Sequence, residues 1–362
     1  MRTISELAVR VAAGANLAVI ALMLLVGYSD RLNPVDYPMA ANLGLLFPGF
    51  IALNVMCLVF WLMVRKRMAI IPFAGLLAGF GPIRTYTPLN ITQDVPEDAL
   101  KVMSYNVYNF STWDDFNVSN GEILSYIERE SPDLLCLQEP NATGTKLKTR
   151  DEVLGGIYPY IDTLRIRSGS MIMLCSKLPI IGKHHIDYDS ESNLSGVFVI
   201  KTGDKDTTLV VANHLESTRL TSEDKSSFKS IVKGDLKKQD MKEQSQHLWH
   251  KLAIQTARRA PQADAVAEYV RQNKGKSIIL MGDFNDSPIS YARHVIASEL
   301  NDCYVACGNG PGISYHYNGF YVRIDHVMCS DDWQPCKCKV DNSIKASDHY
   351  PIICWLKKRQ TH

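Results

Sequence analysis

Two long uncharged segments near the N-terminus restrict the fold of this chain more than any other feature. Residues 11–28 are apolar except for Asn16, and residues 43–64 form an apolar run with no charged side chain. A bilayer span needs about 20 apolar residues, because the helix itself must satisfy every backbone polar group inside the hydrocarbon. Both segments are therefore predicted to be transmembrane helices.

A third uncharged segment, residues 68–83, is shorter and contains Pro72, Pro82 and several glycines. As a helix it reaches roughly 24 Å, which is less than the ~30 Å hydrocarbon core. Extension past Arg84 would close this gap, so we expect spans over about 11–28, 43–64 and 68–84, within an anchor of residues 1–84. A cleaved signal peptide is the alternative for the first segment, but no small-residue cleavage site follows it.

Basic residues predict the orientation of these spans. The turn 65–67 is Arg-Lys-Arg, and Arg2 and Arg10 flank the first span, whereas the loop 29–42 carries only Arg31 as a basic residue. The positive-inside rule places the N-terminus and the 65–67 turn in the cytoplasm. With three spans the chain after about residue 90 lies outside the cytoplasm, and with two it is cytoplasmic. We expect an integral protein of the inner or plasma membrane whose larger, C-terminal part is extracytoplasmic.

Net charge and cysteine spacing exclude some classes of protein. A net charge of +1 gives no global electrostatic case for binding nucleic acid. The nine cysteines contain no CxxC pair and no zinc pattern. Three of them lie in apolar strand-like runs and are expected to be buried thiols: Cys136, Cys175 and Cys354. Five others cluster late in the chain and allow one or two disulfides outside the cytoplasm: Cys303, Cys307, Cys329, Cys336 and Cys338.

The remaining chain alternates between strand-like and helix-like runs. Residues 85–99, with two prolines, resemble a linker, and residues 100–357 form the expected second domain. Strands are predicted at 100–107, 133–138, 170–176, 196–201, 207–214, 277–282, 322–329 and 350–356. Helices are predicted at 121–130, about 222–232, about 245–273 and 290–298. This alternation favours an α/β or α+β domain built on stacked sheets.

Segment 217–251 is polar and rich in lysine and arginine, and it separates two motif-bearing strands. Two interpretations stay open. It is a solvated helical insertion, or it is a basic flap over an anionic substrate or a lipid surface.

Six short motifs follow or end the apolar runs: SYNVYNF at 104–110, LCLQEP at 135–140, VANHLES at 211–217, MGDFND at 281–286, RIDHVM at 323–328 and ASDHYP at 346–351. Strand ends that face one side of a sheet can converge on one site. Together these motifs supply four carboxylates, two amides and two imidazoles, a set that suits a divalent metal and a phosphate.

The amide and carboxylate at the first two strand ends are candidate metal ligands. Glu139 ends the run DLLCLQE, and a strand-end carboxylate suits a hard cation. Asn106 ends KVMSYN and can hold a metal-bound water or a phosphate oxygen without adding charge. The alternatives are an ordinary strand-end acid and a turn asparagine.

GDFND is the most specific local motif. Gly282 is expected to allow a tight turn after SIILM. Asp283 can orient and deprotonate a water molecule, and Asn285 can donate a hydrogen bond to a phosphoryl oxygen. In an extended chain the two side chains would share one side. An Asx-rich turn is the alternative.

Histidines complete the candidate set. Asp348 and His349 would point to opposite faces of a strand, so that one faces the metal and the other the substrate. Asp325 is a candidate to fix the tautomer of His349. His214 ends another strand and could donate to a non-bridging oxygen or to the leaving group, although a lone histidine is usually structural.

Two further residues are candidate substrate contacts. Arg258 and Gln262 lie at i and i+4 of a predicted helix and could share a face with the substrate, with helix-to-sheet packing as an equal alternative. His184, His185 and His316 are expected to be loop residues without a role.

Taken in this order, the motifs resemble those of the endonuclease/exonuclease/phosphatase superfamily, with similarity to its deoxyribonuclease and sphingomyelinase-like members. The resemblance covers about residues 100–357 and implies a four-layer α/β sandwich, two packed β-sheets flanked by helices. It implies cleavage of phosphoester bonds with a divalent cation, Mg²⁺ or Mn²⁺.

The resemblance also implies roles for single residues. Glu139 would be the principal metal ligand, with Asn106 beside it and Asp348 assisting. His349, oriented by Asp325, would stabilise the pentacovalent phosphorus or move a proton. His214 matches a position where pancreatic-type deoxyribonucleases and sphingomyelinase-like members carry histidine. The abasic-site branch typically has a tyrosine nearby, which argues against abasic-site repair here.

A membrane-anchored, metal-dependent phosphoesterase of the nuclease type is the leading functional hypothesis. A phospholipid or inositol-phosphate phosphohydrolase is the alternative, because it fits the membrane tether. A catalytically dead binding domain would require missing key positions, and none is missing. A transporter is disfavoured because ionisable residues are absent from the depths of the apolar segments. The expected partners are a nucleic acid or phospholipid headgroup and the membrane, and no protein partner is indicated.

Overall fold

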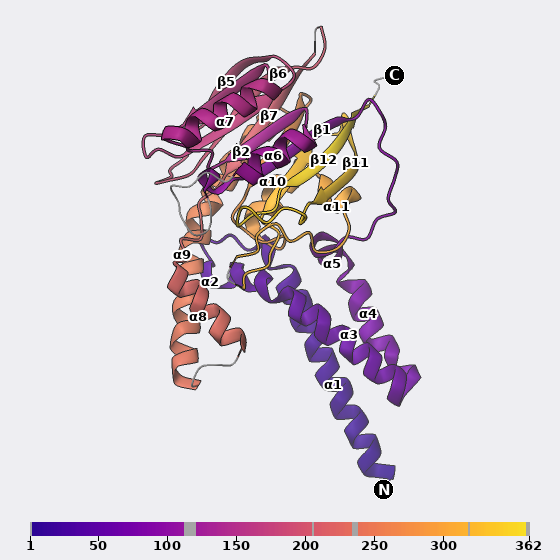
Figure 1. The fold of residues 1–362 in the computed structure, drawn as a ribbon. Coiled ribbons are helices and arrows are strands. Elements are labelled where there is room, and N and C mark those ends of the chain that lie inside the picture. The colour runs from indigo at the N-terminus through magenta and orange to yellow at the C-terminus, as the bar shows by residue number, and fades with distance from the viewer. Residues whose placement is uncertain (1, 112–120, 205, 234–237, 318, 360–362) are drawn as a thin grey trace.

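The chain folds into a helical stalk and a larger sheet-containing domain (Figure 1). The structure is a computed structural model, and it describes residues 2–111, 121–204, 206–233, 238–317 and 319–359. The N-terminal stalk extends from one end of the domain.

The stalk consists of apolar helices. Its helices are α1 (Arg2–Gly27), η1 (Ser29–Arg31), α2 (Pro38–Ala41), η2 (Asn42–Leu46), α3 (Phe47–Val64), η3 (Lys66–Ala69), α4 (Ile70–Ala78) and α5 (Phe80–Tyr86). Two stretches, Glu6–Arg31 and Pro38–Val64, are long and apolar enough to cross a membrane. A third candidate is the pair Lys66–Ala78 and Phe80–Tyr86, which is bent by 64° at the break between its helices. These stretches overlap the three predicted spans in the sequence. That they cross a membrane, and in which orientation, stays a prediction.

The first and last strands of the domain belong to one mixed six-stranded sheet. Its order is β11-β12-β1-β2-β4-β3, and only β1 and β2 run parallel. The strands are β1 (Leu100–Asn106), β2 (Leu134–Gln138), β3 (Tyr160–Arg165), β4 (Met171–Ser176), β11 (Trp333–Val340) and β12 (Ile352–Lys358).

A second mixed six-stranded sheet packs against the first. Its order is β5-β6-β7-β8-β10-β9, and only β7 and β8 run parallel. The strands are β5 (Ile180–Ile186), β6 (Leu194–Lys201), β7 (Thr207–His214), β8 (Ser277–Asp283), β9 (Asn301–Asp302) and β10 (Asp325–Cys329).

Neighbouring residues of one strand point into different hydrophobic layers. Val102 packs between the sheets, together with Val210 of the second sheet, whereas Met103 packs under the outer helices. Side chains alternate along a strand, so a strand buried on both faces reads as one continuous apolar run. This explains why the strand-like runs of the sequence lack the polar alternation of a half-exposed strand.

Helices cover both outer faces and complete four layers. α6 (Gly121–Glu130) and α7 (Gly144–Ile157) pack on the first sheet through Ile127 and Leu154. α9 (Lys238–Gln272) and α10 (Tyr291–Ala297) pack on the second through Val266 and Ile296. A short helix, α11 (Cys303–Cys307), follows β9. The four-layer sandwich of two packed sheets flanked by helices is confirmed.

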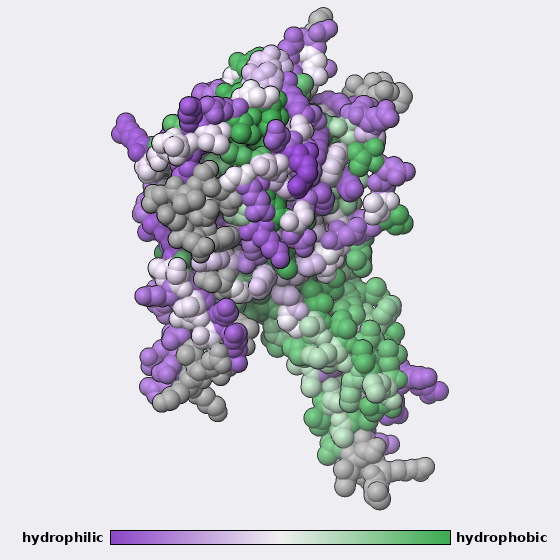
Figure 2. Space-filling view, viewed as in Figure 1, coloured by the Kyte–Doolittle hydropathy of each residue, from purple (hydrophilic) through white to green (hydrophobic). Residues whose placement is uncertain are grey.

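The basic insertion forms two helices that leave the domain beside the stalk. α8 (Ser222–Lys233) and the first half of α9 descend from the domain on the same side as α1, α3 and α4 (Figure 1). The surface of this hairpin is hydrophilic, whereas the stalk beside it is hydrophobic (Figure 2). Residues 234–237, which fall between α8 and α9 in the insertion, lie outside the described residues.

Stalk and domain are joined by buried contacts. Asn42 of η2 accepts a hydrogen bond from Thr256 of α9 (Oγ1···Oδ1, 2.9 Å). A small cluster of Met23, Val26, Phe47 and Ile289 is buried where α1 and α3 meet the domain. At the end of the stalk, the buried Arg323 donates to the backbone carbonyls of Thr85 and Tyr86. The first residues of the predicted linker are therefore held against the domain.

Several expectations about elements were wrong. The sequence reading missed α7, β3, β5 and β11, and it placed His184 and His185 in a loop, although both lie in β5. Their exposed side chains lack the apolar signal by which the buried strands were recognised.

The late cysteines form no disulfide: all nine cysteines are free thiols, and the Sγ atoms of Cys303 and Cys329 lie 3.7 Å apart.

Candidate active site

The polar strand ends of the two sheets meet at one edge of the sandwich. β1 and β2 end there from the first sheet, β7 and β8 end there from the second, and β10 begins there. The carboxyl ends of parallel strands share an edge, which is why motifs far apart in the sequence come together. Seven of the candidate residues line one cavity of about 230 Å³: Asn106, Glu139, His214, Asp283, Asn285, Asp348 and His349.

Asn106 connects the carboxylates of the two sheets. Its Nδ2 lies 3.2 Å from Oε1 of Glu139 and 3.2 Å from Oδ2 of Asp283, and donates to both. Its Oδ1 accepts a hydrogen bond from the backbone N–H of Tyr108 at 3.2 Å. The amide is thereby fixed between two carboxylates, which lie at the ends of different sheets.

Glu139 lies in a strained turn directly after β2. Its φ of 51° is left-handed, a conformation that costs a non-glycine residue roughly 1–2 kcal/mol. The turn directs the carboxylate into the cavity. Burial raises the pKa of Glu139, and the negative charge of Asp348 raises it further, while the hydrogen bond from Asn106 opposes the rise. A cation at this position would relieve that repulsion.

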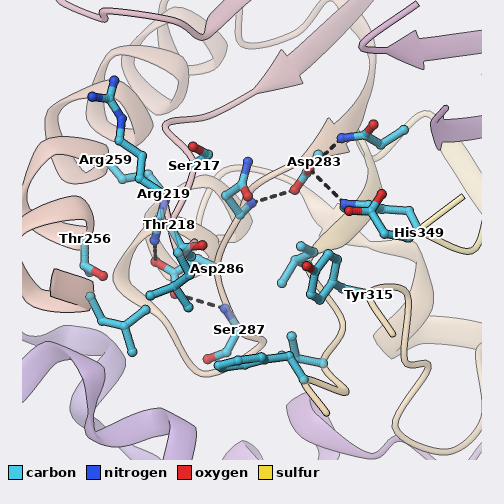
Figure 3. Close-up of a pocket in the computed structure, with 18 of the residues that line it drawn as sticks. Ser217, Thr218, Arg219, Thr256, Arg259, Asp283, Asp286, Ser287, Tyr315 and His349 are labelled. Carbon is cyan, nitrogen blue, oxygen red and sulfur yellow. Dashed lines mark hydrogen bonds and ion pairs between the residues drawn. The ribbon is translucent and has the colours of Figure 1, made fainter. Parts of the chain in front are cut away.

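Asp283 is buried at the end of β8 and faces His349 (Figure 3). Its Oδ1 accepts a hydrogen bond from the backbone N–H of Asn285 at 2.7 Å. This contact is an Asx turn, so the turn interpretation of GDFND also holds. Asn285 is left-handed, with φ of 52°, and its side chain donates to the carbonyl of Leu215 at 2.9 Å. The two side chains are therefore not arranged as in an extended strand.

Gly282 lies within β8 and not in the expected turn, so a different contact explains why glycine is needed here. It pairs with Asn213 of β7, and its φ is 147°. A Cβ at this position would lie 2.0 Å from the carbonyl oxygen of Asn213. The glycine permits close approach of two parallel strands immediately before Asp283.

His349 and Asp325 form a buried pair. Nδ1 of His349 lies 2.8 Å from Oδ2 of Asp325, the contact expected from the sequence, and Nε2 lies 3.6 Å from Oδ2 of Asp283. Burial alone would lower the pKa of His349, but the charges of Asp325 and Asp283 raise it above its ordinary value. The edge of the ring also packs against Tyr315. The imidazole is therefore fixed in orientation and favoured in its cationic form.

His214 has the opposite electrostatic setting. Burial lowers its pKa, and the charge of Asp283 only partly offsets this effect. Its Nε2 lies 3.8 Å from Glu139 and 3.9 Å from Asp283, and its Nδ1 has no hydrogen-bond partner among the described residues. The cavity therefore holds one histidine that favours the cation and one that favours the neutral ring.

Asp348 and His349 both line the cavity, although adjacent residues of a strand would diverge. They precede β12 in a loop rather than in the strand, so alternation does not apply to them. Asp348 faces the same space as Glu139 and Lys225, whose charges interact with it.

Sequence reasoning missed several residues of the cavity. Lys225 of α8 donates to the hydroxyl of Tyr315 at 2.6 Å, and burial lowers its pKa while the charges of Asp348 and Glu139 oppose that change. Arg219 lies on the loop before α8. Both belong to the basic segment 217–251. Its lysine and arginine content, on which the flap interpretation rests, was the sequence signal that could have found them. Asn42 and Leu45 of the stalk also line the cavity, and nothing in their local sequence indicates it.

Arg258 and Gln262 do not line the cavity. Arg258 is exposed, and its Nη1 lies 3.2 Å from Oε1 of Glu191. Gln262 is buried, accepts from the backbone N–H of Glu216 at 2.8 Å and donates to the carbonyl of Asp189. Its position is that of a packing residue between α9 and the loop after β7.

Two groups of donors could hold a cation, one of them including Asp325, which lies behind His349 and does not line the cavity. Asp283, Asp325 and His349 carry ligand atoms within 4.8 Å of one another. Glu139 and Asp348 supply carboxylate oxygens, and the amide of Asn106 lies beside Glu139 with its Oδ1 accepting from the backbone N–H of Tyr108. A protonated imidazole cannot ligate a metal, and the carboxylates around His349 favour protonation. The oxygen donors therefore fit a hard divalent cation better than the histidine group does.

Family models match two parts of the chain. A model described as the endonuclease/exonuclease/phosphatase family matches residues 103–349, which include every candidate site residue. A second model, for a domain of unknown function (DUF8431), matches residues 9–86 of the stalk. No relative was found among curated proteins.

Solved structures share the sandwich. An endonuclease/exonuclease/phosphatase from Beutenbergia cavernae has 15% identity and a TM-score of 0.51, covering 73% of this chain and 72% of its own. The human nocturnin catalytic domain with bound sulfate anion has 13% identity and a TM-score of 0.50, covering 73% and 96%. At such identities the likeness shows the fold alone.

Proposed function

Because the chain belongs to the endonuclease/exonuclease/phosphatase family, whose hydrolases act on phosphoester bonds, we propose that it is a divalent-metal-dependent phosphoesterase held at a membrane by its N-terminal helices. The proposed reaction is attack of water on the phosphorus of a phosphodiester or phosphomonoester. The observation that carries the proposal is the hydrogen-bonded convergence of Asn106, Glu139 and Asp283 from both sheets, beside the His349–Asp325 pair.

Asn106, Glu139 and Asp348 are the proposed holders of Mg²⁺ or Mn²⁺. The carboxylate oxygens of Glu139 and Asp348 suit a hard cation. Burial, and after it the negative charge of Asp348, raises the pKa of Glu139, and a cation would offset both effects. When bound, the cation supplies neutralisation of the phosphate charge and polarisation of a phosphoryl oxygen.

Asp283 is the proposed base for the attacking water. Burial raises its pKa, and the positive charge of His349 opposes the rise. A carboxylate that is a stronger base than an exposed one removes a proton from water more readily. Asn285 has a second side-chain N–H beyond the one given to Leu215, and this N–H can donate to a phosphoryl oxygen.

The two histidines are proposed to act on the phosphate and on the leaving oxygen. His349, held by Asp325, can donate from Nε2 as charge builds on the phosphoryl oxygens. His214 favours the neutral ring and can move a proton to or from the leaving group. Lys225 places a further positive charge beside the same cavity.

The test is hydrolysis of bis-p-nitrophenyl phosphate by the purified full-length chain in detergent. We expect turnover with Mg²⁺ or Mn²⁺, loss in EDTA and recovery when the metal is restored. Asp283→Asn and His349→Ala should each reduce turnover by more than about a hundredfold while the fold is retained. His185→Ala, at an exposed histidine of β5, is the matched control and should behave as the wild-type chain does.

Near-normal turnover in either cavity variant would remove that residue from the mechanism. Wild-type turnover that persists in EDTA and after extensive chelation would contradict metal dependence. Absence of hydrolysis with every added metal would contradict the proposed activity itself.

A further inference from the structure

The stalk contributes part of the cavity wall. Asn42 and Leu45 of η2 line the same cavity as Asp283 and His349. η2 is fixed there by the hydrogen bond between Thr256 and Asn42 and by the approach of Gly44 to the Ile289 carbonyl, where a Cβ would lie 2.0 Å away. The site is therefore incomplete without η2, which lies in the first part of the candidate span Pro38–Val64.

This wall lies at the end of the apolar spans. η2 leads directly into α3, and Leu45 precedes the first residue of α3 by two positions. At about 1.5 Å per helical residue, Leu45 lies within roughly 10 Å of Pro38, where the second candidate span begins. If the spans cross a bilayer, the cavity lies at the membrane surface and not above it.

Exposed apolar side chains continue the spans around the base of the domain. Val35, between the two candidate spans, is 60% exposed, and Met39, at the start of the second, is 46% exposed. Both border a groove with Ile254 of α9, which is 41% exposed. Figure 2 shows hydrophobic surface reaching from the stalk to the underside of the domain. Contiguous apolar surface of this kind marks contact with a membrane or partner, and its continuity with the spans selects the membrane.

The cavity is lined by two chemically different kinds of side chain. The carboxylates, amides and histidines of the proposed mechanism line it together with Lys225 and Arg219. Apolar side chains line it as well: Leu45, Leu220, Leu252, Phe320, Val322 and Ile324. A phosphate with an attached apolar group matches both kinds of lining, whereas a polynucleotide backbone offers no apolar counterpart to the second.

The α8–α9 hairpin adds positive charge on the membrane side. It descends beside the stalk (Figure 1), and Lys229, Lys233 and Lys242 on it are exposed. Lysines near a bilayer surface are attracted to anionic headgroups. The hairpin therefore suits contact with the headgroup layer from which a lipid would enter the cavity.

From these observations we infer that the substrate is a membrane phospholipid, whose phosphoester headgroup reaches the cavity from the bilayer while its apolar part contacts the wall formed by Leu45 and Leu252. The inference rests on the proposed phosphoesterase function and on the stalk crossing a membrane. It names a substrate class and assigns a stalk residue to substrate binding.

The experiment compares two substrates in one sample. Full-length protein is reconstituted into phosphatidylcholine vesicles that contain phosphatidylserine, a phosphatidylinositol phosphate or sphingomyelin, with Mg²⁺ present. Headgroup release is measured by mass spectrometry, and hydrolysis of bis-p-nitrophenyl phosphate and nicking of plasmid DNA are measured in parallel. We expect headgroup release from at least one vesicle type and no nicking.

Variants of the apolar wall test the binding mode. Leu45→Asp should lower the ratio of headgroup release to soluble-ester hydrolysis by about tenfold or more, because a charge in an apolar contact opposes its burial. Leu252→Asp, at the other leucine of this wall, tests the same point if the first variant does not fold. Ile181→Asp, at an exposed apolar position of β5, is the matched control and should leave both rates unchanged.

The outcomes separate the two proposals. Hydrolysis of the soluble ester with DNA nicking and without headgroup release would overturn the inference and keep the phosphoesterase, as a nuclease. An unchanged ratio in both wall variants would overturn the assignment of the wall. No hydrolysis of any substrate would refute the proposed function and the inference together.

Discussion

Removal of the Asp325 carboxylate should slow turnover without unfolding the protein. Asp325→Ala deletes the 2.8 Å hydrogen bond to Nδ1 of His349. A hydrogen bond to a charged group is worth roughly 1.5–3 kcal/mol, which corresponds to a loss of roughly 10- to 150-fold in rate if the bond acts in the transition state. Asp325→Asn should fall between wild type and Asp325→Ala, because an amide oxygen accepts the bond without its charge.

Stability should respond differently from activity. Oδ1 of Asp325 is buried and accepts no hydrogen bond from the described residues, so the variant also removes a buried polar atom whose hydrogen bonding is not satisfied. The matched control is Asp302→Asn, because Asp302 is a buried carboxylate at the other end of the same sheet region, bonded to Arg293 at 2.9 and 3.1 Å. Breaking that pair should cost roughly 3–5 kcal/mol of stability and leave the activity of folded protein unchanged.

The assay combines kcat/KM for bis-p-nitrophenyl phosphate, thermal unfolding and a pH profile. In wild type the neighbouring carboxylates raise the pKa of His349, so its protonated form persists to higher pH. In Asp325→Ala one of these charges is gone, the pKa falls, and activity that needs the protonated ring should be lost at lower pH than in wild type. A kcat/KM within about threefold of wild type with an unmoved alkaline limb would refute the reasoning.

Three further predictions concern the metal, the strands and the membrane. Glu139→Gln should raise the Mg²⁺ concentration needed for half-maximal turnover and lower turnover by more than about a hundredfold; a normal metal titration would remove it as a ligand. Gly282→Ala should destabilise the domain by roughly 1–3 kcal/mol, because its Cβ would lie 2.0 Å from the Asn213 carbonyl; Gly156→Ala, where a Cβ meets nothing within 4 Å, is the control, and equal melting temperatures would contradict the clash. Ser168→Cys, in the exposed loop between β3 and β4, should react with a membrane-impermeant maleimide added outside intact cells; reaction only after permeabilisation would place the domain in the cytoplasm.

The sequence was sufficient for features whose signal is local. Continuous apolar runs identified the buried strands β1, β2, β7 and β8, because both of their faces lie in hydrophobic layers. The same runs placed polar residues at strand ends, and parallel strands bring those ends to one edge. This is why Asn106, Glu139 and Asp283 were recognised as one group before any distance was known.

Elements with weaker local signals were missed. β5 and β3 are edge strands with exposed side chains, so they lack the apolar run that identified the central strands. α7 buries Lys146 and Arg150 along with Leu154, so its buried face carries no regular apolar stripe. The exposed or charged composition of these elements does not determine their conformation, which depends on the strands and layers they join.

The tertiary structure decides the charge of the cavity histidines and the direction in which the α9 side chains point. Whether His349 favours a cation and His214 a neutral ring depends on how many carboxylates surround each buried ring, and those carboxylates come from different strands. Arg258 and Gln262 share a helix, yet one is exposed and the other is buried against the loop after β7.

The sequence by itself determined that two or three apolar segments precede a two-sheet domain with a polar cluster at its strand ends. It did so because hydrophobic periodicity and strand-end chemistry are properties of neighbouring residues. Only the tertiary structure brought Asn42 and Leu45 beside Asp283, which lies more than two hundred residues away along the chain. A contact of this kind is set by how the stalk packs on Ile289 and Thr256, and no local pattern records it.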